Sequence, residues 1–265
     1  MLQFDLHALP RDSAVVFEDH AVLVSSLGSG YATISRVLAA EDLRLALGQD
    51  ARKPRGVSDE LALTVLDSCA PRHYSLPIYT TTVNGSSDEK ATFRARLILS
   101  LVTRLGPSKR VLLLGAVPSI VKALRVAGHQ VMAFDMDPQW RGVDCYDIGV
   151  SVGNSNAYAT TFPEADVVVA TGMTLVNGSG LGLLEQTKSS NKPLVFYCQS
   201  LANIAPILAS TWSQLAVISE PFPNYFLAGR TPFQVFAGRA WKRGAWGKGT
   251  LDMPTALWEV NSPHE

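Results

Sequence analysis

One glycine and two aspartates have the spacing of a nucleoside-binding turn. Gly115 follows the apolar run 111–114, and Asp135 and Asp137 follow the next apolar run along the chain. A glycine lets the backbone turn sharply beside a ligand, and N–H groups at the start of the following helix can bind a polar group. A carboxylate at the end of the second strand can accept hydrogen bonds from both ribose hydroxyls. The spacing therefore predicts an adenosine pocket.

The same turn lacks part of the pattern that binds a pyrophosphate. A dinucleotide-binding GxGxxG motif needs three glycines, but here only Gly115 is present and Pro118 replaces a flexible position. S-adenosylmethionine has an adenosine and no phosphate, so it fits this pocket better than NAD. An ordinary turn with a solvated aspartate is the alternative interpretation. The residues expected to contact the substrate here are Gly115, Ala116, Val117, Pro118, Ser119, Asp135 and Asp137.

A second polar loop follows the apolar run 166–170. Small and hydroxyl-bearing residues directly after a buried strand place donors at the mouth of a sheet, where a ribose or a carboxylate can bind. The alternative interpretation is that Thr174 and Asn177 only cap the next helix. From this loop we expect ligand contacts by Thr171, Gly172, Met173, Thr174 and Asn177.

Further candidates lie in the polar stretch 149–161 and among the tyrosines. Such an insert can close over a substrate at the carboxyl end of a sheet. The sulfonium of S-adenosylmethionine would also favour an aromatic face, through cation–π attraction. We expect the N-terminal part of the chain to close the pocket and to bring tyrosines to the ligand. The candidate site residues are Asn154, Asn156 and Tyr158 in this stretch, and Tyr31 and Tyr79 before it.

Composition excludes several other classes of protein. Hydrophobic residues make up 47% of the 265 residues and charged residues 17%, which is typical of a globular chain with a large core. Lys plus Arg and Asp plus Glu both number 23, so no net charge attracts nucleic acid. The histidines and the cysteines (Cys69, Cys145 and Cys198) show no metal-ligand spacing, and no apolar run is long enough to span a membrane. We expect a cytoplasmic protein with a small-molecule substrate and no metal; a homodimer stays open.

The scaffold expected to position these residues changes near residue 105. From residue 110 onward, continuously apolar strands alternate with helices, which predicts a doubly wound sheet covered on both faces. The fold class expected is therefore α/β, a Rossmann-like and mostly parallel sheet with a smaller N-terminal α+β domain. We divide the chain into residues 1–105 and 106–265. Strands are expected over 111–114, 130–134, 166–170 and 193–198, helices over 120–127 and 182–188, with 201–210 and 215–218 continuing the winding.

The N-terminal third shows the patterns of a mixed α+β unit. A short spacer between the β-rich runs 14–17 and 21–25 suits a hairpin. Helices are expected over 32–47, 61–70 and 91–105, and Ser86 to Glu89 offer an N-cap to the last of these. An extended segment is expected over 76–83.

Two stretches resemble a known family. Gly115-Ala116-Val117-Pro118 and the segment Ala165 to Gly178, with its Thr-Gly-Met-Thr-Leu-Val-Asn-Gly loop, resemble a Rossmann-like family named for heavy-metal chelation. This resemblance implies a small N-terminal α+β domain followed by a Rossmann-like domain. The scarcity of Cys and His departs from a chelating protein.

The sequence is also similar to bacterial azetidine-2-carboxylate synthases, S-adenosylmethionine-consuming cyclases that work beside nonribosomal peptide synthetases. This second resemblance implies that S-adenosylmethionine is the substrate, and that its α-amine attacks its own Cγ and releases methylthioadenosine. The catalytic residues expected for this reaction, which would hold the amino-acid end of the substrate, are Asn154, Asn156, Tyr158 and Thr174. The alternatives are a small-molecule methyltransferase that uses the same pocket, and a non-catalytic module that binds a metal or a metallophore.

Overall fold

The computed structural model describes residues 13–17, 20–24, 29–33, 59–70, 76–137, 140, 152–154, 157–221 and 229–244. Among these residues, eight strands form one large sheet in the order β4-β11-β10-β9-β8-β5-β6-β7. Its strands are β4 (Tyr79–Gly85), β5 (Arg110–Leu114), β6 (Gln130–Asp135), β7 (Val152–Asn154), β8 (Val167–Thr171), β9 (Leu194–Cys198), β10 (Leu215–Ser219) and β11 (Gly229–Ala237).

Six neighbouring strands of this sheet, from β10 to β7, are all parallel. Numbered along the chain from β5, they stand in the order 3-2-1-4-5-6, which is that of the dinucleotide-binding fold. The order reverses between β5 and β8. In open α/β sheets, ligands bind at the carboxyl ends of the strands beside such a reversal. The expected α/β fold with a mostly parallel sheet is confirmed.

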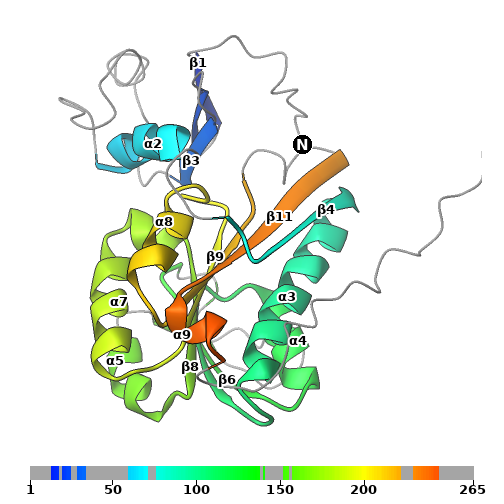
Figure 1. Cartoon of the computed structure of the whole chain (residues 1–265), viewed down its shortest axis with the longest axis vertical. Helices are drawn as coiled ribbons and strands as arrows, with labels where there is room; N and C mark the ends of the chain where they lie inside the picture. Colours follow the sequence, from blue (N-terminus) through cyan, green and yellow to red (C-terminus); the bar gives the residue numbers. More distant parts are fainter. Residues whose placement is uncertain are drawn as a thin grey trace, which may run out of the picture.

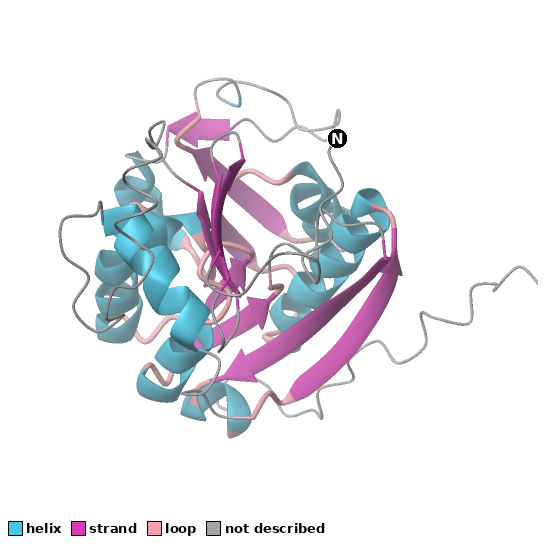
Figure 2. Cartoon of the chain, turned by 90° about the horizontal axis from the view of Figure 1, so that it is seen from above, coloured by secondary structure: helices cyan, strands magenta, loops and turns pink. Residues whose placement is uncertain are grey.

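Helices cover both faces of the sheet, as Figure 2 shows from above. The helices α3 (Ser87–Arg104) and α4 (Pro118–Val126) lie on one face, and α5 (Tyr158–Thr161), α7 (Ser179–Ser189) and α8 (Ala205–Thr211) on the other. Shorter helices are η6 (Phe162–Glu164), α6 (Met173–Val176) and α9 (Arg239–Lys242).

Alternating strand residues build the two core layers beneath these helices. Val111 and Leu113 of β5 pack under α3 and α4, whereas Leu112 and Leu114 of the same strand pack on the opposite face. All four side chains are at most 5% exposed. Since side chains alternate across a strand, a strand buried on both faces must be apolar at every position. This explains the continuous apolar runs of the sequence.

A smaller unit contains β1 (Ser13–Phe17), β2 (His20–Val24), β3 (Ser29–Thr33) and α2 (Asp59–Cys69). The three strands form an antiparallel sheet, and α2 packs against β2 and β3. Figure 1 shows this unit (blue to cyan) at one end of the molecule. Both α2 and β3 contact α6, which follows the carboxyl end of β8. The unit therefore lies beside the carboxyl edge of the large sheet.

Two elements of the N-terminal third belong to the large sheet and its helical layer. We expected the extended segment and the helix before residue 105 in the N-terminal domain, but β4 pairs with β11 and α3 packs on β9 and β10. Both elements thus belong to the large sheet and its helical layer, because their apolar side chains complete that core. The division of the chain into domains stays a prediction. Residues 32 and 33, expected in a helix, end β3, and 34–47 lie outside the described residues.

Within the described part of the chain, no helix has the length and apolar character needed to cross a membrane.

Candidate functional site

A cavity of about 750 Å³ lies at the carboxyl ends of β5, β6 and β8, where the strand order reverses. Its volume falls within the ~300–1,000 Å³ typical of small-molecule sites. The described residues that line it are Leu114, Gly115, Ala116, Val117, Pro118, Phe134, Asp135, Met136, Asp137, Trp140, Tyr158, Ala159, Thr171, Met173, Thr174, Asn177, Ser179 and Tyr197.

Most of the candidates chosen from the sequence meet at this cavity. The turn after β5, the two aspartates after β6, the loop after β8 and Tyr158 all contribute to its lining. Parallel strands bring their carboxyl ends to one edge, which explains why residues far apart in the chain converge. Whether they bind a ligand stays a prediction.

Other candidates lie elsewhere. Ser119 and Gly172 do not line the cavity, and Gly172 is buried where an added Cβ would clash with the backbone oxygen of Ser200. Tyr79 does not line it either, because β4 is the edge strand at the other end of the sheet from β6 and β7. The side chains of Tyr31 and Asn154, and the whole of Asn156, lie outside the described residues.

Gly115 occupies a position that no other residue fits. Its φ is +95°, a backbone conformation that side chains rarely allow. A Cβ on Gly115 would lie 2.6 Å from the Tyr197 hydroxyl oxygen and 2.8 Å from Cγ2 of Thr171. The N–H of Gly115 donates to the carbonyl of Phe134 at 2.8 Å. The turn is therefore packed against three neighbouring strands.

Tyr197 hydrogen-bonds to the carbonyl group of this turn. Its hydroxyl donates to the carbonyl oxygen of Gly115 at 2.9 Å, and the Thr171 side chain hydrogen-bonds to the same hydroxyl. Burial raises the pKa of Tyr197 far above its ordinary value, so the hydroxyl keeps its proton. Tyr197 therefore acts as a hydrogen-bond donor that fixes the Gly115 carbonyl, and it is not a base.

Asp135 is bound by the backbone of the same turn. One carboxylate oxygen accepts from the N–H of Ala116 at 2.7 Å, and the other accepts from the N–H of Asp137 at 2.9 Å. These bonds fix the orientation of the Asp135 carboxylate between β5 and β6. Asp137 is exposed at the rim of the cavity, which makes it the better-placed acceptor for a ligand hydroxyl.

Three polar side chains of the lining hydrogen-bond within the protein. The Thr174 hydroxyl donates to the carbonyl of Thr171 at 2.7 Å, which leaves its lone pairs for a ligand. The Asn177 side chain accepts from the Ser179 hydroxyl at 2.7 Å and donates to the sulfur of Met136 at 3.0 Å. Thr174 therefore presents an acceptor to a ligand.

The described lining of the cavity is acidic and rich in aromatic side chains. Of the described residues around the cavity, two are aspartates and none is Lys, Arg or His. Four aromatic rings and two thioethers also face it, from Phe134, Trp140, Tyr158, Tyr197, Met136 and Met173. Carboxylates and ring faces both attract cations, especially in a partly desolvated site. The described lining therefore favours a ligand that carries positive charge and hydrogen-bond donors.

Sequence reasoning missed several lining residues. Tyr197 lies within a continuously apolar strand and touches Gly115 across 82 residues of chain, so no local pattern indicates its role. Trp140 lies three residues after Asp137, and its aromatic side chain on that loop was the one signal that could have found it.

A buried ionic cluster lies beyond Tyr197, at the carboxyl ends of β9 and β10. Arg94 of α3 donates to both carboxylate oxygens of Glu220, at 2.5 and 3.0 Å, and both residues are at most 4% exposed. Burial raises the pKa of Glu220, while the charge of Arg94 opposes this rise. Lys90, one helical turn before Arg94, is fully buried, and burial lowers its pKa. The cluster ties α3 to the end of β10.

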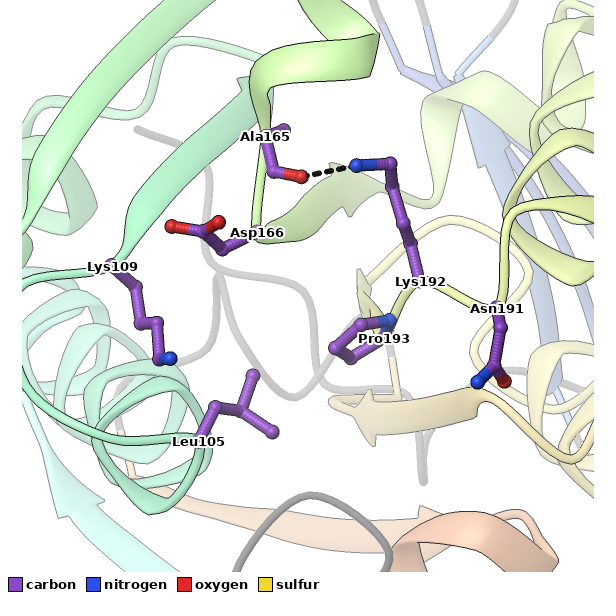
Figure 3. A pocket seen from close by; sticks show the side chains of 7 residues that line it. All are labelled: Leu105, Lys109, Ala165, Asp166, Asn191, Lys192 and Pro193. Carbon is purple, nitrogen blue, oxygen red and sulfur yellow. Dashed lines mark hydrogen bonds between the residues drawn. The ribbon is translucent and has the colours of Figure 1, made fainter.

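A smaller cavity of about 340 Å³ lies at the opposite edge, near the amino ends of β5, β8 and β9 (Figure 3). Lys192 reaches across it and donates to the carbonyls of Ala165 and Pro163. Asp166 pairs with Arg110 at 3.0 Å, and the hydrogen bond from Arg110 lowers the pKa of that carboxyl. None of the candidates chosen from the sequence lines this cavity, and its charged groups connect neighbouring segments of the fold.

The geometry defines a doubly wound α/β protein with a cavity at its strand-order reversal, and comparisons with known proteins agree with that fold. Residues 98–196, less than half of the chain, match the model of the DUF364 family, whose description reads "Putative heavy-metal chelation". This stretch contains the glycine turn, both aspartates and the loop after β8. No curated protein matches the chain.

Two solved structures share the fold over most of the chain. A DUF364 protein of unknown function from Desulfitobacterium hafniense DCB-2 is 16% identical, with a TM-score of 0.57, over 86% of this chain and 95% of that one. A second, from Pyrococcus horikoshii, is 13% identical, with a TM-score of 0.54, over 84% and 91%. At these identities the likeness concerns the fold alone.

The described residues do not fit a heavy-metal site. Among them, no three His, Cys, Asp or Glu side chains lie together as metal ligands would. Cys198 is buried, and burial raises the pKa of its thiol, which opposes the thiolate form that binds metals. The side chains of Cys69 and Cys145 lie outside the described residues.

Proposed function

We propose that the protein binds S-adenosylmethionine in the cavity at the β5 and β8 ends and converts it to azetidine-2-carboxylate and methylthioadenosine. One observation carries the choice of ligand: the described lining has two carboxylates, four aromatic rings and no cationic side chain. S-adenosylmethionine brings a sulfonium, an ammonium and ribose hydroxyls, which are the cation and the donors that such a lining attracts. The choice of reaction rests on the resemblance of the sequence to azetidine-2-carboxylate synthases.

The proposed reaction needs no second substrate. The ammonium of the substrate first gives one proton to a base, and the neutral α-amine then attacks Cγ. The N–Cγ bond forms while the Cγ–S bond breaks, its electron pair stays on sulfur, and the ring nitrogen keeps two hydrogens. Well-oriented intramolecular reactions reach effective molarities of ~10⁵ M or more, so holding the amine against Cγ would supply much of the rate.

The described residues suggest how the chain would hold the substrate. Asp137 would accept from the ribose hydroxyls, and the rigid turn at Gly115 would pack against the nucleoside. Thr174 keeps only lone pairs for a ligand, so it would accept from the α-ammonium and orient it. Tyr158 and Trp140 would offer ring faces to the sulfonium. Asn154 and Asn156 stay further candidates for the amino-acid end.

Product analysis tests the proposal. The purified protein is incubated with S-adenosylmethionine alone, and both products are identified by mass and by retention against authentic compounds. We expect methylthioadenosine together with azetidine-2-carboxylate. Raising the pH through the pKa of the substrate ammonium should speed the reaction, because the amine must lose its proton.

Each alternative gives a different outcome in the same experiment. A methyltransferase needs an acceptor and leaves S-adenosylhomocysteine, whereas a metal-binding module leaves the nucleoside unchanged. Spontaneous decay yields methylthioadenosine with homoserine lactone. Homoserine lactone alone, formed at the uncatalysed rate in the presence of folded protein, would end the cyclase interpretation.

A further inference from the structure

We propose that the turn after β5 excludes nucleotides that carry a phosphate, and that Asp135 is the residue that sets this selectivity. The inference rests on the proposed nucleoside ligand and deepens it. It concerns the class of substrate that the cavity accepts: nucleosides whose 5′ substituent is neutral or cationic.

The backbone donors of the turn are already used. In doubly wound folds that bind phosphate, free N–H groups at the start of the first helix point at the ligand. Here the N–H of Ala116 donates to Asp135 at 2.7 Å, and the N–H of Val117 donates to the Gly115 carbonyl at 2.9 Å. Pro118, the first residue of α4, has no N–H. These three consecutive positions therefore offer no amide hydrogen to a phosphate.

The carboxylate of Asp135 occupies the position at the Ala116 N–H where a phosphate would otherwise bind. A phosphate within hydrogen-bond distance of the Ala116 N–H would lie against this carboxylate, and like charges at such a distance repel strongly. Asp137 adds a second negative charge, and none of the described lining residues is cationic to compensate it. A sulfonium, by contrast, is attracted to both carboxylates.

The turn cannot readily reorient its amides to accept a phosphate. The Gly115 carbonyl accepts from the Tyr197 hydroxyl at 2.9 Å, and the Gly115 N–H donates to Phe134. The side chains of Tyr197 and Thr171 also pack closely against Gly115, so a reoriented peptide would have to break the Tyr197 hydrogen bond at a crowded position. The donor pattern is thus fixed before any ligand arrives.

Calorimetric titration of the full chain with adenosine and with adenosine 5′-monophosphate tests this inference. We expect the wild-type protein to bind adenosine at least about tenfold more tightly than the monophosphate. Asp135→Asn keeps the side-chain volume and one acceptor oxygen for Ala116 but removes the charge, so the two affinities should approach within about threefold. Glu185→Gln, which removes an exposed charge on α7, should leave the ratio unchanged.

A second variant keeps the test independent of how well Asp135→Asn folds. Pro118→Ala gives the turn one free N–H and should raise the affinity for the monophosphate about two- to threefold, with adenosine unaffected. Equal wild-type affinity for both ligands would overturn the inference and leave the nucleoside site standing. Unchanged selectivity in both variants would overturn the role of Asp135 and the turn. Failure of the folded protein to bind adenosine, methylthioadenosine or S-adenosylmethionine would overturn the proposed function as well.

Discussion

At the scale of single residues, the cavity depends on how tightly the turn at Gly115 is held. Side chains and backbone groups of three other strands hydrogen-bond to this turn or pack against it. They are Phe134 and Asp135 from β6, Thr171 from β8 and Tyr197 from β9. A site whose backbone is fixed in advance loses less entropy when it binds a ligand. The same rigidity makes the turn sensitive to any added atom.

Gly115→Ala should destabilise the protein by about 2–5 kcal/mol, because the new Cβ combines a strained φ with contact to Tyr197 and Thr171. Gly182→Ala is the matched control. Gly182 lies within α7 with nothing near its Cβ position, so alanine should stabilise the helix by about 0.5–1 kcal/mol. Denaturant unfolding of both variants measures the difference. A Gly115→Ala protein as stable as the wild type would show that the turn is not packed as described.

Asp137→Asn should weaken S-adenosylmethionine binding about tenfold or more with little change in stability, because a hydrogen bond to a charged acceptor contributes about 1.5–3 kcal/mol. Asp137 is exposed, so the fold itself should tolerate the change. Calorimetry measures the affinity, with Glu185→Gln as the control for the loss of one charge. Wild-type affinity in Asp137→Asn would remove this residue from the ribose site.

The sequence predicted most residues of this site from the strand ends that they follow, and Tyr158 from the polar stretch 149–161. Gly115, Asp135 and Asp137 could be found because turn chemistry and strand periodicity are local signals. Tyr197 could not be found, because an apolar strand gives no sign that one of its hydroxyls reaches another strand. The sequence also could not show that Asp135 binds the turn itself, since that bond depends on strand register.

At the scale of elements, local signals predicted the start of α3 but not the strand β11. The Ser86 N-cap of α3 is confirmed as a capping box, in which the Ser86 side chain accepts from the N–H of Glu89 and the Glu89 side chain accepts from the N–H of Ser86. The strand β11 was not predicted, because Pro232 argues against a central strand. Pro232 is tolerated because β11 extends past β10 at that point and pairs there only with β4.

One side chain of α2 ties the N-terminal unit to the large sheet. Asp67 is 1% exposed and accepts from the N–H groups of Asn203 and Ile204, both at 2.9 Å, at the start of α8. A carboxylate at this position satisfies backbone donors that a helix start leaves unpaired. The contact therefore positions α2 beside the carboxyl edge where the cavity lies.

Asp67→Ala should cost about 1–3 kcal/mol for each buried amide that it leaves unpaired. The loss should concentrate in α2, whose amides should exchange hydrogen faster than those of β5 and β8. Hydrogen exchange measured by mass spectrometry tests this, with Asp59→Ala at the exposed start of the same helix as the control. Equal protection of α2 in Asp67→Ala and in the wild type would contradict the role given to Asp67.

At the scale of the whole molecule, the position of one strand depends on pairing between distant parts of the chain, which local sequence patterns do not show. The alternation of apolar strands and helices predicted the doubly wound sheet and the edge at which its candidates meet. The position of β4 was missed, because its partner β11 lies near the other end of the chain and no local pattern connects them. Loop residues outside the described part of the chain also leave some candidates untested.

The stability of the whole fold should depend on pH through His129. This residue is 2% exposed and accepts from the N–H of Lys109 at 3.1 Å. Burial, and then the charge of Lys109, lower the pKa of His129 below its ordinary value. As pH falls below about 6.5, the unfolded chain binds a proton that the folded chain does not, so the free energy of unfolding should decrease until the lower, folded pKa is passed.

Denaturant unfolding across this pH range measures the effect. His129→Gln should lose this part of the pH dependence, because the side chain no longer titrates. The same slope in both proteins would assign the pH dependence to other groups.

A crystal structure of the protein grown with S-adenosylmethionine or methylthioadenosine would show whether the cavity binds a nucleoside. We expect the nucleoside in the cavity at the ends of β5 and β8, with its ribose hydroxyls at Asp137 and no displacement of the Gly115 turn. An intact fold with this cavity empty and the nucleoside bound elsewhere, or not bound at all, would contradict this expectation.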